Sequence, residues 1–335
     1  MTTELTQATP AAPQAEQVLP RVYRIDCPFG DGGIVHVYYL DAAEPALIDT
    51  GIRQSVRDVI EPALALAGFA LGDVRHIFNT HGHWDHMGGN GAARASASQA
   101  RTYLHPADHY LLEDVERHVH GYVTYPARLL NDEAALAQLT TTLRRSIDCP
   151  TPVDVAVGDG DRFDLGAGAH LRAVHTPGHS RGSTSYLLEG ANALFTGDGV
   201  QGLGSRPGQL PLVFDDSQGY RATLVKLAAL PVEALCMGHS FCGLSAESGR
   251  DPVRRGSAAR TFLEESGEAA KAVEEAMRSV LQTRGEAGVL PTARATLAPL
   301  AHPLGLELDE SGLSIRCLAT LHAFYRELTG APLPA

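Results

Sequence analysis

The chain has 335 residues, of which 44% are hydrophobic, and a formal net charge of −12. This length is enough for one large domain or two smaller ones with a buried core, and the hydrophobic share is ordinary for a globular protein. The net negative charge argues against a protein that binds the phosphate backbone of nucleic acids, which would need a basic surface. Because no apolar run in the sequence reaches about 18 residues, we also expect no membrane span.

The first 18 residues are rich in Thr, Ala, Pro and Gln and show no hydrophobic periodicity, which predicts a disordered tail over residues 1–18. They lack the basic start and apolar stretch of a secretory signal. The five cysteines are odd in number and scattered along the chain: Cys27, Cys149, Cys236, Cys242 and Cys317. We therefore expect no disulfide framework, and a cytoplasmic location.

Strands are predicted first at residues 22–26, 34–41 and 46–49, the second of which is a run of β-branched and aromatic residues. A helix is predicted over 53–67, where Val56, Ile60 and Leu64 recur at helical spacing. Another helix is predicted over 217–230, and further strands at 75–79, 101–104, 170–175, 184–188, 192–196 and 234–237. Strands in excess, with helices between several of them, indicate two sheets faced by helices.

Two regions have a different pattern. Residues 106–150 are predicted to be helical, with Leu136, Leu139 and Leu143 near one face. In this stretch or just before it lie four histidines, which we interpret as ordinary histidines on helix faces because no tight ligand spacing links them: His105, His109, His118 and His120. From residue 251 onward the apolar spacing predicts only helices, which would cap a site, pack against a dimer partner or cover a sheet edge.

The strongest motif is Thr80-His81-Gly82-His83-Trp84-Asp85-His86-Met87-Gly88-Gly89, which places four metal-ligand side chains within six residues. Imidazoles and a carboxylate suit zinc, iron or manganese, and the absence of thiolates from the motif argues against a closed structural zinc site. In an extended turn, His81 and His83 project to the same side and can share one metal, while Asp85 and His86 point elsewhere. Polar residues at a loop tip are the weaker interpretation, because clustered His and Asp ligands are typical of metal sites.

Three later segments repeat one design, an apolar strand followed by a glycine and a ligand residue. They end in His179, Asp198 and His239. Each is weak evidence by itself, because many strands end at glycine. Together with the first cluster they predict a catalytic site, which needs several protein ligands and an open position.

With these motifs in this order, the chain resembles the metallo-β-lactamase superfamily. The resemblance implies a four-layer αββα sandwich, here with an added C-terminal helical segment. The expected division is a tail over 1–18, a catalytic domain over 19–248 with a helical insertion at 106–150, and a helical appendage over 249–335. It also implies one metal held by His81, His83 and His179, and a second held by Asp85, His86 and His239. Asp198 would bridge the two metals, and Asp49 would steady the ligand loop from outside the ligand set.

The resemblance implies two divalent metal ions, with zinc as the leading expectation and iron or manganese as alternatives. A hydroxide held between two metals is a nucleophile near neutral pH, which suits hydrolysis of an acyl bond. The expected catalytic residues are Asp85, which would move protons, and Asp198. The expected partner is a small-molecule acyl substrate, with a homodimer left open and no role for nucleic acid or membrane.

Departures from the family pattern bear on the substrate. β-Lactamases of this fold mostly carry cysteine at the position of Asp198, and the related lactone hydrolases often carry a tyrosine soon after it. The glyoxalase II branch keeps basic residues there, a role for which Arg206 is the candidate. The segment 211–216, Tyr220 and the helical C-terminus are similar to thioesterases of the quinolone-signal type. We therefore expect a thioesterase or esterase, with Arg206, Phe214 and Tyr220 as candidate substrate-binding residues; packing is the alternative role for the last two.

Other functions stay open at this stage. One is a lactone hydrolase. Another is a persulfide dioxygenase of the same fold, with a single iron held by His81, His179 and Asp198. A third is a regulatory protein that keeps its metals without turnover. A hydrolase is preferred, because an open two-metal site is first of all a hydrolytic arrangement.

Overall fold

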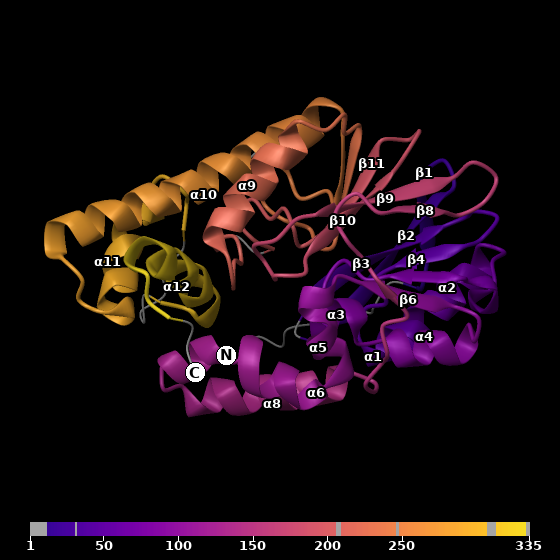
Figure 1. Ribbon diagram of the computed structural model, residues 1–335, viewed down its shortest axis with the longest axis horizontal. Helices are drawn as coiled ribbons and strands as arrows, with labels where there is room; N and C mark the ends of the chain where they lie inside the picture. Colours follow the sequence, from indigo (N-terminus) through magenta and orange to yellow (C-terminus); the bar gives the residue numbers. More distant parts are fainter. Residues whose placement is uncertain (1–11, 31, 206–208, 246–247, 307–312, 333–335) are drawn as a thin grey trace, which may run out of the picture.

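The computed structural model describes residues 12–30, 32–205, 209–245, 248–306 and 313–332. Two β-sheets pack face to face, and helices cover the outer side of each sheet (Figure 1). This is the predicted αββα sandwich with C-terminal helices. None of the helices in the described ranges has the length and apolar character needed to cross a membrane.

The first sheet has seven strands that neighbour one another in sequence order. Pairing is antiparallel from β1 to β4 and parallel from β4 to β7. In β3, Val35 and Val37 pack towards the outer helices while Tyr38 packs towards the second sheet, because successive side chains of a strand point to opposite faces. The strands are β1 (Ala15–Leu19), β2 (Val22–Phe29), β3 (Gly33–Leu40), β4 (Ala46–Ile48), β5 (His76–Phe78), β6 (Arg101–Leu104) and β7 (Val155–Ala156).

The second sheet has six strands in the order β13-β12-β11-β10-β9-β8. Only β11 and β12 pair in parallel, and the other neighbours are antiparallel. Between the two sheets lies an aromatic core that includes Phe78, Tyr186 and Phe195. The strands are β8 (Arg162–Asp164), β9 (His170–His175), β10 (Thr184–Leu188), β11 (Ala193–Gly197), β12 (Ala234–Met237) and β13 (Val253–Arg255).

The outer face of the first sheet is covered by helices that follow β4 and β5. Ile60 and Leu64 are fully buried there against Val37 and Ile77, as the helical spacing predicts. Burial of such side chains contributes about 1.5–3 kcal/mol each. The helical elements on this side are α1 (Arg53–Ser55), η1 (Val56–Ile60), α2 (Glu61–Leu66), η2 (Leu71–Asp73), α3 (Trp84–Met87) and α4 (Asn90–Ser96).

The stretch between β6 and β7 is helical, as predicted for residues 106–150. Asp132 begins its longest helix by accepting a hydrogen bond from the N–H of Ala135 at 2.9 Å. The elements of this insertion are η3 (Pro106–Asp108), α5 (His109–Glu113), α6 (Val115–Arg117), η4 (His118–Tyr122), α7 (Tyr125–Leu129) and α8 (Glu133–Ser146).

The outer face of the second sheet is covered by α9 and the C-terminal helices, and Leu224, Phe262 and Leu321 are buried in one core with Leu235 of the sheet. The last helix also reaches the insertion, because the Tyr125 hydroxyl donates to the carbonyl of Ala319 at 3.4 Å. The C-terminal segment therefore both covers the sheet and closes over one end of it. These helices are α9 (Ser217–Ala228), α10 (Ser257–Arg284), α11 (Val289–Ala301) and α12 (Ile315–Thr329).

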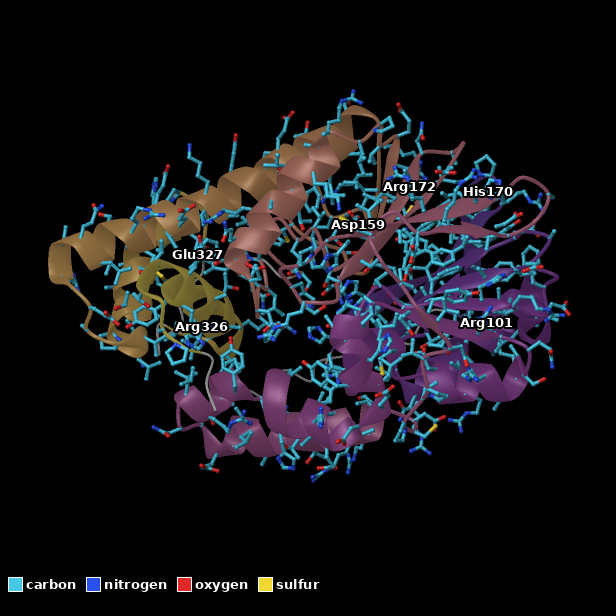
Figure 2. The ribbon with its side chains drawn as sticks, in the orientation of Figure 1. Arg101, Asp159, His170, Arg172, Arg326 and Glu327 are labelled. Carbon is cyan, nitrogen blue, oxygen red and sulfur yellow. The ribbon has the colours of Figure 1, made fainter. Side chains whose placement is uncertain are left out.

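Charged side chains also join these helices to one another. Glu327 of α12, labelled in Figure 2, pairs with Arg221 of α9 at 2.6 Å. The same guanidinium lies 2.5 Å from a carboxylate oxygen of Glu274 in α10. One arginine therefore links α9, α10 and α12, in addition to the apolar core that the three helices share.

Two predicted boundaries are wrong. Residues 15–18, assigned to a disordered tail, belong to β1, which pairs with β2 and buries Val18. Residues 253–255, assigned to an all-helical segment, form β13, which adds an edge strand beside β12. Both strands are short edge strands that a neighbouring strand stabilises, so their own composition carries little signal.

Candidate metal centre

The His-rich motif lies at the carboxyl end of β5. His81 and His83 occupy the loop after this strand, and α3 then carries Asp85 and His86. The loop runs close to its neighbours: a Cβ atom on Gly89 would lie 2.6 Å from the carbonyl oxygen of Thr50. All three imidazoles are buried, so they face the interior of the site and not solvent.

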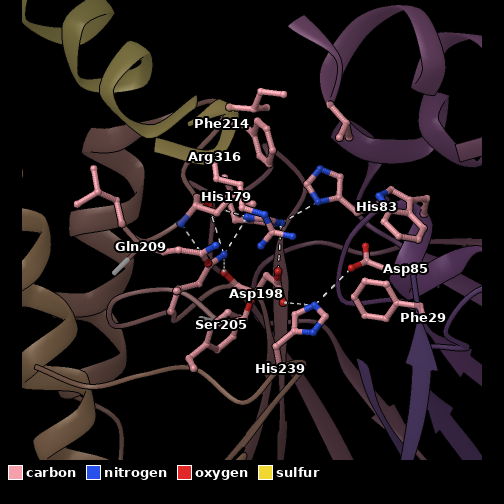
Figure 3. A pocket seen from close by; sticks show the side chains of 18 of the residues that line it. Phe29, His83, Asp85, His179, Asp198, Ser205, Gln209, Phe214, His239 and Arg316 are labelled. Carbon is pink, nitrogen blue, oxygen red and sulfur yellow. Dashed lines mark hydrogen bonds and ion pairs between the residues drawn. The ribbon is translucent and has the colours of Figure 1, made fainter. Parts of the chain in front are cut away.

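The second sheet supplies the other predicted ligands from the same end of the sandwich. His179 follows β9, Asp198 follows β11 directly, and His239 follows β12. Each is less than 10% exposed. Figure 3 shows these three side chains converging on His83 and Asp85 of the first sheet. The structure thus brings together all seven residues predicted from the sequence.

The side chains form overlapping groups whose ligand atoms lie within 4.8 Å of one another: His81, His83 and His179; His81, His86 and Asp198; and Asp85, His86 and His239. In the first group, Nε2 of His179 lies 2.7 Å from Nδ1 of His83. In the third, Nε2 of His239 lies 3.4 Å from Oδ2 of Asp85.

Asp198 lies between the groups. Its Oδ2 is 3.4 Å from Nε2 of His179, and its Oδ1 is 3.4 Å from Nε2 of His86 and 3.6 Å from Nε2 of His239. The two carboxylate oxygens therefore face different sets of histidines. This is the arrangement expected of a bridging carboxylate.

Burial and neighbouring charges shift the pKa values of the cluster in ways that favour a bound cation. Burial, and then the neighbouring histidines, hold the pKa of His81 well below its usual range, which keeps its imidazole neutral. Burial would raise the pKa of Asp198, but His239, His86 and His179 hold it far below its usual range, which keeps it ionised. Within the described ranges, no hydrogen-bond partner lies at the buried Nε2 of His81. Neutral imidazoles and ionised carboxylates are the ligand forms that metals bind. Against burial, Asp198 and its neighbouring carboxylates raise the pKa of His86 and of His239, and a bound divalent ion would replace the protons that these two rings carry. The residues therefore fit divalent metal ions.

Hydrogen bonds from outside the ligand set orient three of the rings. Asp49 accepts from Nδ1 of His86 at 2.8 Å, as its predicted role requires. Nδ1 of His179 donates to the carbonyl of Leu212, and Nδ1 of His239 donates to the carbonyl of Ile34, each at 2.6 Å. These bonds place the Nε2 atoms of the rings towards the site.

A cavity of about 260 Å³ opens beside these ligands. Phe214 lines it and packs its ring against His83 and His179, with centroids 5.4 and 5.6 Å apart. Tyr220 is fully buried, accepts a hydrogen bond from the N–H of Gln201 at 3.2 Å and is not among the residues that line this cavity. Arg206 lies outside the described residues.

Sequence reasoning missed several residues of the cavity wall. Leu139 reaches it from α8, and Ile315 and Arg316 reach it from the first turn of α12. Figure 3 shows Arg316 among the side chains that surround the candidate metal ligands. No local motif marks these positions, because only the packing of the insertion and the appendage brings them to the site.

The candidate ligand groups found among the described residues contain none of the other histidines of the insertion, although the ring of His118 packs edge-on against that of His83 with centroids 6.0 Å apart. Burial lowers the pKa of His118 to about 4, as for a neutral core histidine. His105 stacks on His175 with ring centroids 4.2 Å apart. His109, His118 and His120 lie in helices, and His105 directly precedes η3.

An αββα sandwich with a buried His and Asp cluster at one end of its sheets defines a class of metal-binding hydrolase folds. The family model of the metallo-beta-lactamase superfamily matches residues 30–239. The chain therefore belongs to this superfamily.

The sequence is also similar to individual members of this superfamily. The chain is similar to a hydroxyacylglutathione hydrolase of Ruegeria pomeroyi, with 29% identity over 206 residues that cover 61% of each chain. It is also similar to an atrochrysone carboxyl ACP thioesterase of Paecilomyces divaricatus, with 28% identity over 66% of this chain and 55% of the relative. The match spans 50–61% of the length of the first curated relatives.

Solved structures share the fold. A metallo-beta-lactamase family protein of Thermus thermophilus superimposes with a TM-score of 0.67 and 24% identity, over 93% of this chain and 95% of that one. A subclass B3 metallo-beta-lactamase of Bradyrhizobium japonicum superimposes with a TM-score of 0.54 and 24% identity, over 80% and 95%.

Proposed function

We propose that this chain is a dinuclear metal-dependent hydrolase that cleaves an acyl bond, either a thioester or an oxygen ester. The observation that carries the proposal is the position of Asp198, whose two oxygens face different histidine groups at the floor of a cavity. A carboxylate placed in this way can hold two metals close together, and paired metals of this kind serve hydrolysis. The relatives named hydroxyacylglutathione hydrolase and ACP thioesterase support the choice of an acyl bond.

In this proposal His81, His83 and His179 hold one metal, Asp85, His86 and His239 hold the other, and Asp198 holds both. Two divalent ions, with zinc as the first choice, would activate a water molecule and polarise the carbonyl oxygen of the substrate. Asp85 lines the cavity, and its histidine neighbours keep its pKa below the usual range although burial would raise it. An ionised carboxylate facing the cavity can accept a proton and pass it to the leaving group.

The cavity wall favours an apolar acyl group. Beside the His and Asp cluster, nine of its lining side chains are apolar, among them Phe29, Val123, Leu139, Leu212 and Phe214. A volume of about 260 Å³ is at the small end of ligand pockets, so we propose that the acyl portion enters while the leaving group extends outward.

Arg316 completes the proposed binding site. Among the described residues that line the cavity, it is the only arginine or lysine. Once bound metal ions neutralise the negative charges of Asp85 and Asp198, the guanidinium of Arg316 supplies positive charge on the cavity wall. We propose that it binds an anionic group or a carbonyl oxygen of the substrate.

The test is release of free thiol from a panel of acyl-CoA and acyl-glutathione thioesters, with Asp198→Ala as the control. Metal-dependent release by the wild type, absent from the variant, is the expected result. Release by neither protein would contradict thioester cleavage and direct the same assay to oxygen esters and lactones. Uptake of oxygen with a persulfide substrate and one bound iron would overturn the proposal.

A further inference from the structure

Asp108 ties together two loops that carry ligands of the same metal. It lies at the end of the first turn of the insertion and is 1% exposed. Its Oδ2 accepts hydrogen bonds from the N–H of Gly82 at 3.0 Å and from the hydroxyl of Ser180 at 2.6 Å. Its Oδ1 accepts from the N–H of Gly182 at 2.9 Å. One buried carboxylate thus joins the loop after β5 to the loop after β9.

The donors adjoin the ligands of one metal group. Gly82 lies between His81 and His83 in the chain, and Ser180 follows His179. Because the loop backbone donates directly to Asp108, a shift of this carboxylate would move the backbone that carries these rings. Misplacement of ligands by a fraction of an ångström is enough to weaken a metal site.

The glycines permit this close approach. A Cβ atom on Gly182 would lie 2.6 Å from Cγ of Asp108, and one on Gly82 would lie 2.8 Å from Cδ1 of Leu111. Side chains at either position would push the loops away from the insertion. Both glycines therefore have a packing reason that is specific to Asp108 and its helix.

A different carboxylate orients a ring of the other metal group. Asp49 accepts from the N–H and the hydroxyl of Thr80, each at 2.8 Å, and from the ring of His86. The two acids thus approach the ligand loop from different elements, Asp49 from the end of β4 and Asp108 from the insertion.

We infer that Asp108 is a positioning residue for the metal group formed by His81, His83 and His179. Through Asp108, the geometry of this group depends on how the insertion packs against the two loops. The inference rests on the metal centre proposed above. The insertion would then fix the ligand geometry of one metal. It also supplies part of the cavity wall through Val123 and Leu139. Loss of Asp108 should therefore weaken one metal selectively.

The experiment measures metal affinity in two single-site backgrounds. His239→Ala removes a ligand of the second group and leaves the first to bind metal, and His83→Ala does the reverse. Adding Asp108→Asn keeps the side-chain size but places an N–H₂ group against a backbone N–H. In the His239→Ala background we expect zinc or cobalt affinity to fall about tenfold or more, the range seen for partners that orient metal ligands. In the His83→Ala background the affinity should stay within about twofold.

Two further variants keep the test decisive. Asp154 also accepts a backbone N–H, from Thr102 at 2.8 Å, so Asp154→Asn is the matched control and should leave both affinities unchanged. Ser180→Ala removes one of the three hydrogen bonds to Asp108 and should also lower the metal affinity of the first group. This variant tests the inference even if Asp108→Asn does not fold. The absorption spectrum of the cobalt form should change only in the background that retains the first group.

Equal affinities with and without Asp108→Asn, or equal losses in both backgrounds, would overturn the inference. A wild-type chain that binds two metals would still support the proposed function in that case. A wild-type chain that binds no metal would overturn the proposed function as well.

Discussion

Oδ2 of Asp49 lies 2.8 Å from Nδ1 of His86 and, on its other side, 2.8 Å from the hydroxyl oxygen of Thr80. Asp49 adopts a φ of 62°, in the left-handed region that Asp and Asn tolerate better than most residues. The chain therefore turns sharply after β4, and this turn aims the carboxylate back into the ligand loop. Burial would lower the pKa of His86, but Asp198, Asp49 and Asp85 around it raise the pKa well above the usual range.

We expect Asp49→Asn to keep this backbone turn and lose the charge that holds His86. Affinity for the metal of the second group should fall about 10-fold to 100-fold, with a parallel loss of hydrolysis. Metal content after dialysis against a buffered metal concentration gives the measurement. Asp41→Asn removes a carboxylate from an exposed ion pair with Arg21 and serves as the control. Full metal content in Asp49→Asn would contradict the assigned role.

Removal of the metals should destabilise the chain. Without a cation, the ionised Asp198 and the closely spaced histidine rings remain buried together, and binding energy that belongs only to the folded state is lost. At a free metal concentration about 1,000 times the dissociation constant, this energy is about 4 kcal/mol. Thermal unfolding with and without a chelator tests the prediction, and readdition of zinc should restore the melting temperature. An unchanged melting temperature would argue against a metal in this buried site.

Much of the architecture could be predicted from local pattern alone. The strands from β2 to β6 and from β9 to β12 overlap the segments predicted for them. Their β-branched and aromatic residues carried the prediction in β3, and short buried apolar runs carried it in β4, β11 and β12. The candidate ligand residues could also be predicted, because the first four lie within six consecutive residues and the other three each follow a strand and a glycine.

What could not be predicted depends on contacts between distant segments. β1 carries Glu16 and Gln17 and buries only Val18, so its strand character comes from pairing with β2. Arg316 lies 77 positions after His239, the last ligand, in a helix whose spacing predicts only a buried face. Asp108 looks like an ordinary helix-start residue until the loops of both sheets fold against it.

Arg316 provides a test of the proposed substrate site. If its guanidinium binds an anionic group, Arg316→Gln should raise KM for an anionic thioester about tenfold, which corresponds to about 1.4 kcal/mol. The value of kcat should change by less than about threefold, because the contact is made equally in the ground state and the transition state. A neutral thioester of the same acyl group should show little change.

The control for Arg316 is Arg278→Gln, which alters an exposed arginine on α10 that pairs with Glu274 one helical turn away. Equal effects of Arg316→Gln on the charged and neutral thioesters would show that Arg316 supports the packing of α12 and does not select substrate.

Glu265 ties the appendage to the loop that follows His239. From α10 it accepts hydrogen bonds from the N–H of Leu244 at 3.0 Å and from the hydroxyls of Ser245 and Ser248 at 2.6 and 2.5 Å. Burial would raise the pKa of Glu265, but these donors lower it below the usual value of 4.5. The ionised form is therefore favoured in the folded chain relative to the unfolded one.

We expect Glu265→Gln to reduce the free energy of unfolding by about 1–3 kcal/mol at neutral pH, because one of the two accepting oxygens is replaced by an N–H₂ donor and the charge is lost. Since the folded pKa is the lower one, this contribution is complete above pH 4.5 and is lost as the pH falls through the folded pKa. Denaturant unfolding of wild type and variant at pH 7 and at several acidic values measures the difference. Glu264→Gln, at the adjacent exposed position, is the matched control and should cost little at any pH. A difference between wild type and Glu265→Gln that persists unchanged into strong acid would show that the contribution does not come from the carboxylate charge.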